Sequence, residues 1–167
     1  MNLYIIRHGI AEDLGTNNSY DDSQRALTEA GRKKMHSIAE GLLAFGVKFD
    51  VILSSPYLRA RETAEILADV FETKDKLVFS ENLIPPADPV QLVDEINEKH
   101  QVNSLAVVGH EPALSSLTSI LLSGKPYLNI IMKKGGICHL STDKVRIEGG
   151  ATLEWLLTPS QLVKLGE

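Results

Sequence analysis

Two histidines in this sequence are placed where an imidazole could do chemistry, and each follows a short apolar run. Arg7-His8-Gly9 follows residues 3–6, and Gly109-His110-Glu111 follows residues 105–108. An arginine donates parallel hydrogen bonds to two oxygens of a phosphate or carboxylate, and a glycine lets the backbone approach a bound anion closely. An imidazole can act as a base, a ligand or a nucleophile. Together these residue types predict a reactive site for an anion.

A third polar group follows the apolar run at residues 50–53. Ser54-Ser55-Pro56 is expected to open a helix, because serine is a preferred N-cap and proline fits the first helical position. Arg59 lies one turn further on, and Arg61 would point about 200° away from it around the helix. Only one of the two can therefore face the site, and Arg61 is expected at the surface because Arg59 is the one that carries the resemblance described below.

The spacing of apolar residues predicts the elements that must position these groups. Strands are expected at 3–6, 50–53, 77–79 and 105–108, and helices at 28–46, from 54 onward, at 89–100 and from 112 to 122. Three later segments, 135–140, 144–147 and 151–157, are expected to be short strands that complete the sheet. This alternation predicts an α/β fold, a three-layer α/β/α sandwich with a mainly parallel central sheet. The carboxyl ends of parallel strands share one edge, so the three polar groups and two helix amino termini would form a pocket for a tetrahedral dianion.

The bulk composition is that of an ordinary soluble globular protein. The chain has 167 residues, 43% of them hydrophobic, which favours a single domain spanning residues 1–167. A net charge of −5 disfavours a nucleic-acid partner, and no apolar run is long enough to span a membrane. Cys138 is the only cysteine, so no internal disulfide can form. With no secretory signal in view, we expect a cytoplasmic protein.

The three motifs, in this order, resemble the histidine phosphatase superfamily, which also includes the cofactor-dependent phosphoglycerate mutases. The matching runs are Arg7-His8-Gly9, residues 53–64 around Arg59, and residues 107–112 around His110. Residues 27–31, 134–136 and 155–159 are similar to the SixA-type branch, the protein phosphohistidine phosphatases. The resemblance spans nearly the whole chain and implies a phosphoglycerate mutase-like fold.

The resemblance also implies roles for the site residues. His8 would be the nucleophile that takes the phosphoryl group, Arg7 and Arg59 would bind its oxygens beside Gly9, and His110 would donate a hydrogen bond to it. Elementary chemistry agrees with these roles. An imidazole attacks phosphorus only while its reacting nitrogen is unprotonated, and nearby arginines favour that neutral form. Fixed donors would stabilise charge on the phosphoryl oxygens, and water would then regenerate the histidine.

The motifs do not identify the general acid. Glu81, beyond the third strand, is the main candidate for a catalytic acid and is otherwise a surface carboxylate, with Glu12 and Asp13 as alternatives. Arg25 could add a third cation from the long loop at residues 10–26. An alkoxide needs a proton donor to leave, whereas imidazole leaves a labile phosphoramidate with less help. A chain without an evident acid and without length for a lid therefore favours a phosphohistidine on a protein, such as a histidine-containing phosphotransfer domain.

Three alternatives remain beside a metal-independent phosphohistidine phosphatase. A small-molecule phosphomonoesterase would use the same residues, and a substrate panel separates the two. A non-catalytic module that binds phosphorylated proteins would not require His8, yet the nucleophile is present. A metal site would need a further acidic ligand at a definite spacing, and the two arginines would repel a divalent cation. We therefore expect neither a metal nor a cofactor.

Overall fold

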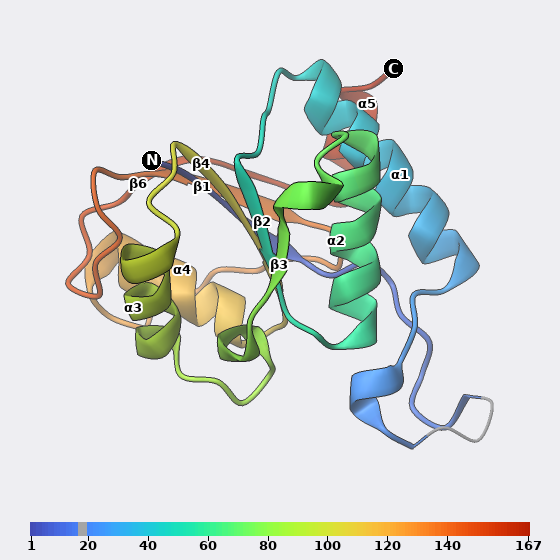
Figure 1. Ribbon diagram of the computed structural model, residues 1–167, viewed down its shortest axis with the longest axis horizontal. Helices are drawn as coiled ribbons and strands as arrows, with labels where there is room; N and C mark the ends of the chain where they lie inside the picture. Colours follow the sequence, from blue (N-terminus) through green and yellow to red (C-terminus); the bar gives the residue numbers. More distant parts are fainter. Residues whose placement is uncertain (17–19) are drawn as a thin grey trace.

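A computed structural model of the chain describes residues 1–16 and 20–167 and contains a six-stranded mixed sheet with helices on both faces (Figure 1). The strand order is β3-β2-β4-β1-β5-β6. Four strands are parallel: β1 (Asn2–Arg7), β2 (Val51–Ser54), β3 (Leu77–Phe79) and β4 (Ser104–Gly109). On the other side of β1, β5 (Ile137–Ser141) pairs antiparallel with β1, and β6 (Thr152–Leu157) pairs antiparallel with β5. The expected α/β/α architecture with a mainly parallel sheet is confirmed.

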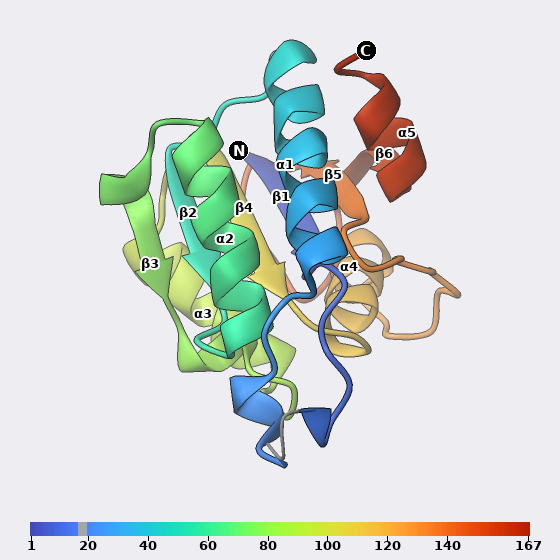
Figure 2. The same ribbon diagram turned by 90° about the vertical axis from the view of Figure 1, so that its right-hand side faces the viewer.

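Five α-helices cover the two faces of the sheet. Figure 2 looks onto the face covered by α1 (Glu29–Ala44), α2 (Leu58–Val70) and α5 (Pro159–Lys164). The opposite face carries α3 (Pro89–Lys99) and α4 (Ala113–Ser123). Each face has its own apolar core, and the strands contribute alternate residues to the two cores. Because both faces are covered, the central strand β4 is buried at every position after its first residue.

The strand register brings the three sequence motifs to one edge of the sheet. β4 lies between β1 and β2, with Gly109 opposite Arg7 and Val108 opposite Ser54. The residues that follow these strands therefore emerge next to one another, at the carboxyl edge where open α/β sheets bind ligands. The convergence expected from the sequence is confirmed for these three strands.

The structure corrects two expectations about local structure. Neither Ser54 nor Ser55 caps α2, since the helix begins at Leu58 with Tyr57 at the cap position. Ser54 ends β2, and the Ser55 hydroxyl is used elsewhere, as described below. Residues 144–147 form no strand. Val145 packs into the apolar core beneath α3, and the residues on either side of it are exposed. Helix α5, which the apolar pattern did not predict, packs on α1 through the close approach of Gly41 and Leu162.

The loop expected at residues 10–26 is partly ordered by its own backbone. A bridge between Ala11 and Leu27 closes its base, and a short 3-10 helix, η2 (Asp22–Gln24), lies near its end. Residues 17–19 of the predicted loop lie outside the described residues. In the part of the chain that is described, no helix has the length and apolar character needed to cross a membrane.

Candidate active site

The hydrogen bonds of His8 identify which of its nitrogens carries the proton. Its Nδ1 lies 2.7 Å from the carbonyl oxygen of Gly9, which can only accept, so Nδ1 is the donor. Its Nε2 lies 3.3 Å from Nε of Arg59, which can only donate, so Nε2 is the acceptor. Both contacts require the same neutral tautomer, with the lone pair on Nε2. The nitrogen that faces Arg59 is therefore the nucleophilic one.

The surroundings of His8 hold it in this neutral form. Burial is the largest cause that lowers the pKa of His8, to about 4, and the positive charges of Arg59, Arg7 and Lys134 lower it further. The Gly9 carbonyl acts in the opposite direction, because it accepts a hydrogen bond from the ring. At neutral pH the lone pair of Nε2 is consequently available without prior deprotonation.

Arg59 is placed by α2, whose first turn it occupies. The helix backbone is tied to the loop after β1, because the Thr63 hydroxyl donates to the Arg59 carbonyl at 2.7 Å and accepts from the Gly9 amide at 3.0 Å. The guanidinium is buried and reaches both His8 and the loop residue Asp22. Two residues on, Arg61 is exposed and pairs with Glu65, as expected from its place on the helix.

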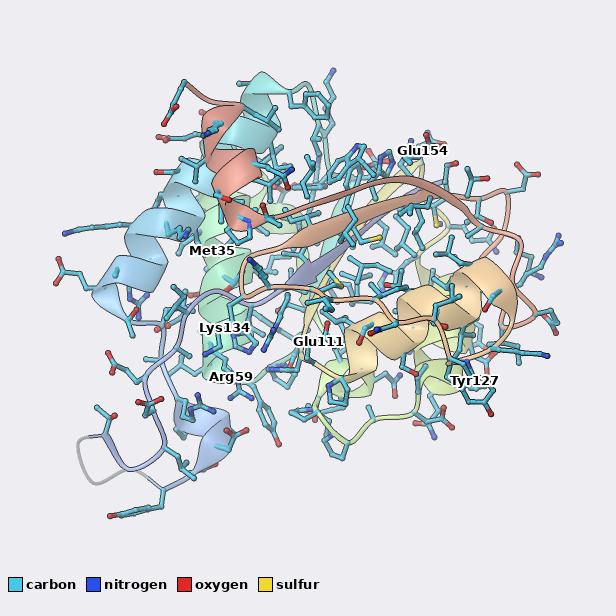
Figure 3. The ribbon with its side chains drawn as sticks, turned by 180° about the vertical axis from the view of Figure 1, so that it is seen from behind. Met35, Arg59, Glu111, Tyr127, Lys134 and Glu154 are labelled. Carbon is cyan, nitrogen blue, oxygen red and sulfur yellow. The ribbon has the colours of Figure 1, made fainter. Side chains whose placement is uncertain are left out.

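Arg7 joins the site to the segment that follows α4. Its Nη1 donates to the Met132 carbonyl at 2.7 Å, and the Gly135 amide lies 3.0 Å from the carbonyl oxygens of both Arg7 and His8. The Arg7 Nε is buried and has no hydrogen-bond partner among the described residues. The same segment brings Lys134 close enough to His8 to lower its pKa, and Figure 3 shows Lys134 toward the same end of the sheet as Arg59.

His110 lies beside His8, with ring centroids 5.2 Å apart. Its Nε2 is 2.8 Å from the Ser55 hydroxyl, and its Nδ1 is buried without a partner among the described residues. Burial is the main cause that lowers the pKa of His110, to about 3, with Arg59 and His8 adding to the effect. Because Ser55 occupies one ring nitrogen, Nδ1 is the nitrogen left to contact a bound group.

The other predicted site residues lie further out. Arg25 donates to the Glu12 carbonyl and to Asp22, and among the described residues it makes no hydrogen bond to His8; its role as a third cation stays a prediction. Glu81 is exposed at the start of the 3-10 turn η4 (Glu81–Leu83). The side chains of Ser80 and Asn82 in this turn donate instead to the carboxylate of Glu95, which lies on α3. A catalytic role for Glu81 stays a prediction.

Four residues of the site were not singled out from the sequence: Asp22, Ser55, Thr63 and Lys134. Ser55 and Thr63 lie inside a recognised motif, so their positions were visible although their hydrogen bonds were not. Asp22 is one of several acidic residues in the polar loop, and nothing in its type distinguishes it from Asp21. Lys134 belongs to a lysine pair whose sequence context favours a solvated surface.

Comparisons with known proteins show the family to which the chain belongs. A family model described as the histidine phosphatase superfamily (branch 1) matches residues 3–84. A solved structure of the protein histidine phosphatase SixA complexed with tungstate superposes with a TM-score of 0.83, at 26% identity, over 97% of this chain and 99% of that one. The chain belongs to the histidine phosphatase superfamily.

Two curated relatives match this superfamily member over almost their whole length. An uncharacterized protein of Picosynechococcus sp. is 33% identical over 162 residues, which is 96% of each chain. Phosphohistidine phosphatase SixA of Escherichia coli (strain K12) is 27% identical over 165 residues, covering 97% of this chain and 96% of the relative. The chain is thus similar to SixA from end to end, and a phosphatase activity is supported.

Proposed function

We propose that this phosphatase hydrolyses phosphohistidine on a protein, through a covalent phosphohistidine at His8 and without a metal ion. The observation that carries the proposal is the unprotonated Nε2 of His8, which is fixed by the Gly9 carbonyl and directed at Arg59. It is supported by the similarity to phosphohistidine phosphatase SixA of Escherichia coli and by the tungstate, a tetrahedral oxyanion, bound in the similar SixA structure.

In the first step the Nε2 lone pair attacks phosphorus, and the bond from phosphorus to the substrate imidazole breaks. The substrate ring, protonated beforehand on its other nitrogen, leaves as neutral imidazole. The phosphoryl group would displace the 3.3 Å contact between Nε2 and Arg59, whose Nε–H would then donate to a phosphoryl oxygen. The free Nε of Arg7 and the Nδ1 of His110 lie ready to donate to the other oxygens. Fixed donors of this kind stabilise the charge that develops in phosphoryl transfer.

In the second step a water molecule attacks phosphorus, and the bond to Nε2 breaks to release phosphate. The phosphorylated imidazole carries a positive charge, and the hydrogen bond from Nδ1 to the Gly9 carbonyl stabilises that charge. When phosphate leaves, the same hydrogen bond restores the neutral tautomer for the next cycle.

The surroundings of His8 favour this chemistry over metal-assisted hydrolysis. Arg7, Arg59 and Lys134 all place positive charge near His8, and that charge attracts an anion and repels a divalent cation.

The substrate preference follows from leaving-group chemistry. The carboxylate nearest to Arg59, Asp22, accepts hydrogen bonds from two arginines, and these keep its pKa low despite the opposing effect of burial. Asp22 is therefore a poor proton donor for an alkoxide, while imidazole leaves with less help.

The test is hydrolysis of a phosphohistidine protein beside p-nitrophenyl phosphate, both in the presence of EDTA. We expect fast release from phosphohistidine, slow release from the ester, and loss of both in His8→Ala. Arg59→Ala should also lose activity, whereas the matched variant Arg61→Ala, on the exposed side of the same helix, should keep it. Labelled enzyme quenched in alkali should retain phosphate on His8, because phosphohistidine is stable in alkali and labile in acid.

Each departure from this pattern has a definite meaning. Fast ester hydrolysis that still depends on His8 would move the substrate to small molecules and keep the mechanism. Activity that survives His8→Ala would remove the proposed nucleophile. Activity lost with EDTA and restored by a divalent cation would refute the metal-free reaction.

A further inference from the structure

Asp22 makes hydrogen bonds to two arginines, and the phosphoryl-transfer steps derived above give it no role. Its carboxylate Oδ2 accepts from Nη2 of Arg59 at 3.0 Å, and its backbone carbonyl accepts from Nη1 of the same guanidinium at 2.7 Å. Its other carboxylate oxygen, Oδ1, accepts from Nη1 of Arg25 at 2.8 Å. The Asp22 side chain is 46% exposed, while that of Arg59 is only 5% exposed.

The planarity of the guanidinium gives these contacts a directional consequence. Asp22 occupies the edge formed by Nη1 and Nη2, and the Nε of Arg59 points to His8. A guanidinium is rigid and planar, so fixing one edge also fixes the direction of the others. Of its five N–H groups, three are accounted for by these contacts, and the rest remain for a ligand.

We propose that Asp22 is a positioning residue, which holds Arg59 so that its Nε edge faces the phosphoryl group as it is transferred to His8. The inference rests on the proposed phosphatase reaction at His8. A long arginine side chain has considerable rotamer freedom, and binding Asp22 removes that freedom before the substrate arrives. The exposed loop residue thereby orients a buried catalytic group.

Arg25 completes the arrangement from the opposite side of Asp22. Its Nε donates to the Glu12 carbonyl at 2.7 Å, while its Nη1 holds Oδ1 of Asp22. Glu12 is in turn paired with Ala26 across the closed base of the loop. Arg25 therefore supports Asp22 and acts on Arg59 only through it.

The same contacts could instead make Asp22 a competitor of the substrate. A carboxylate on an anion-binding arginine can occupy the place of a phosphate, and the loop would then have to leave when phosphate binds. The two roles predict opposite changes in oxyanion affinity when Asp22 is removed. Removing a positioning residue weakens oxyanion binding and slows the reaction, whereas removing a competitor tightens oxyanion binding.

The experiment compares wild type with Asp22→Ala and Asp22→Asn. Asp69→Ala is the matched control, because Asp69 also pairs with a basic residue, Lys74, but lies at the far end of α2. The measurements are kcat/KM for both substrates, the Kd of tungstate by calorimetry, and the urea midpoint as a check on folding. Asp22→Ala and Asp69→Ala are also made in an Arg59→Ala background.

We expect Asp22→Ala to lower kcat/KM by roughly 10- to 100-fold, the range for losing a charge-assisted hydrogen bond, and to weaken tungstate binding. Asp22→Asn keeps an acceptor oxygen and should lose less, and Asp69→Ala should match wild type. In the Arg59→Ala background Asp22→Ala should have no further effect, because nothing is left to position.

Three results would overturn the proposal. The first is a wild-type kcat/KM in Asp22→Ala, and the second is tighter tungstate binding by that variant. The third is that Asp22→Ala lowers kcat/KM and tungstate affinity by the same factor in the Arg59→Ala background as in the wild-type background. Tungstate binding requires no turnover. A wild type that hydrolyses neither substrate would therefore refute the proposed function, while its tungstate affinity would still decide the role of Asp22.

Discussion

Lowering the pH should destabilise this protein through two buried histidines of the candidate site. His8 and His110 are 6% and 2% exposed, and burial is the main reason that their pKa values fall to about 4 and about 3. In the unfolded chain both side chains would titrate near the ordinary value of about 6.5. Between that value and the folded-state pKa, the unfolded chain binds protons that the folded chain does not.

The sign and the size of the effect follow from this difference. The free energy of unfolding falls with falling pH wherever the unfolded state binds more protons. The loss therefore begins near pH 6.5 and continues down to about 4 for His8 and about 3 for His110. Between pH 7 and pH 5 each histidine removes about 2 kcal/mol, or about 4 kcal/mol together. Such a loss is a large part of the stability of an ordinary domain.

Urea unfolding at pH 7 and pH 5 measures this loss directly. His8→Gln should lose about 2 kcal/mol less than wild type between the two pH values. The same substitution at exposed His36 on α1 controls for the removal of a histidine and should keep the wild-type difference. The change in the free energy of unfolding between the two pH values is measured within each variant, so any effect of the substitution on stability at pH 7 cancels. If His8→Gln loses as much stability as wild type, burial of a neutral His8 is not the cause.

Three further predictions concern groups around the site and the core. Thr63→Val should lower the free energy of unfolding in urea by about 1–3 kcal/mol, because the buried Gly9 amide loses its acceptor. Thr63→Ser keeps the hydroxyl and should retain most of the stability. Equal urea midpoints for the two variants would contradict this. Gly41→Ala should lower the melting temperature although alanine favours helices, because its Cβ would lie 2.0 Å from the Leu162 carbonyl oxygen, and a raised melting temperature would show that α1 and α5 separate freely. Burial raises the pKa of the Cys138 thiol to about 12, so it should react with a thiol reagent at pH 8 only after unfolding, and rapid labelling of the folded protein would refute this.

The main features of the site could be predicted because strand ends in a parallel sheet have a fixed geometry. All-apolar runs before His8 and His110 predicted buried strands, and the common edge of those strands brought the two histidines together. Helical periodicity indicated that Arg59 and Arg61 cannot both face the site, and the match to the family motif selected Arg59. None of these inferences needed a side-chain contact, since backbone direction was sufficient.

The groups that orient the reactive residues could not be predicted in the same way. Asp22 reaches Arg59 only because the polar loop folds back at the bridge between Ala11 and Leu27, and loop paths carry no periodicity. Ser55 has the residue type of an N-cap, but its hydroxyl lies against His110 because the helix begins three residues later. The Ser55 hydroxyl also accepts a hydrogen bond from the Tyr57 amide, so its local turn is kept, and the contact with His110, which is distant in the sequence, is added to it.

The strand order also has a consequence for how the protein is made. β1 leads directly to His8, yet its two neighbours, β4 and β5, both come from the second half of the chain. While a ribosome is still adding residue 100, Leu3, Ile5 and Ile6 have no strand beside them. Pairing across such separations is slow to nucleate and leaves apolar edges open to other nascent chains. The reactive histidine is therefore set in place only late in folding, after most of the polypeptide has emerged.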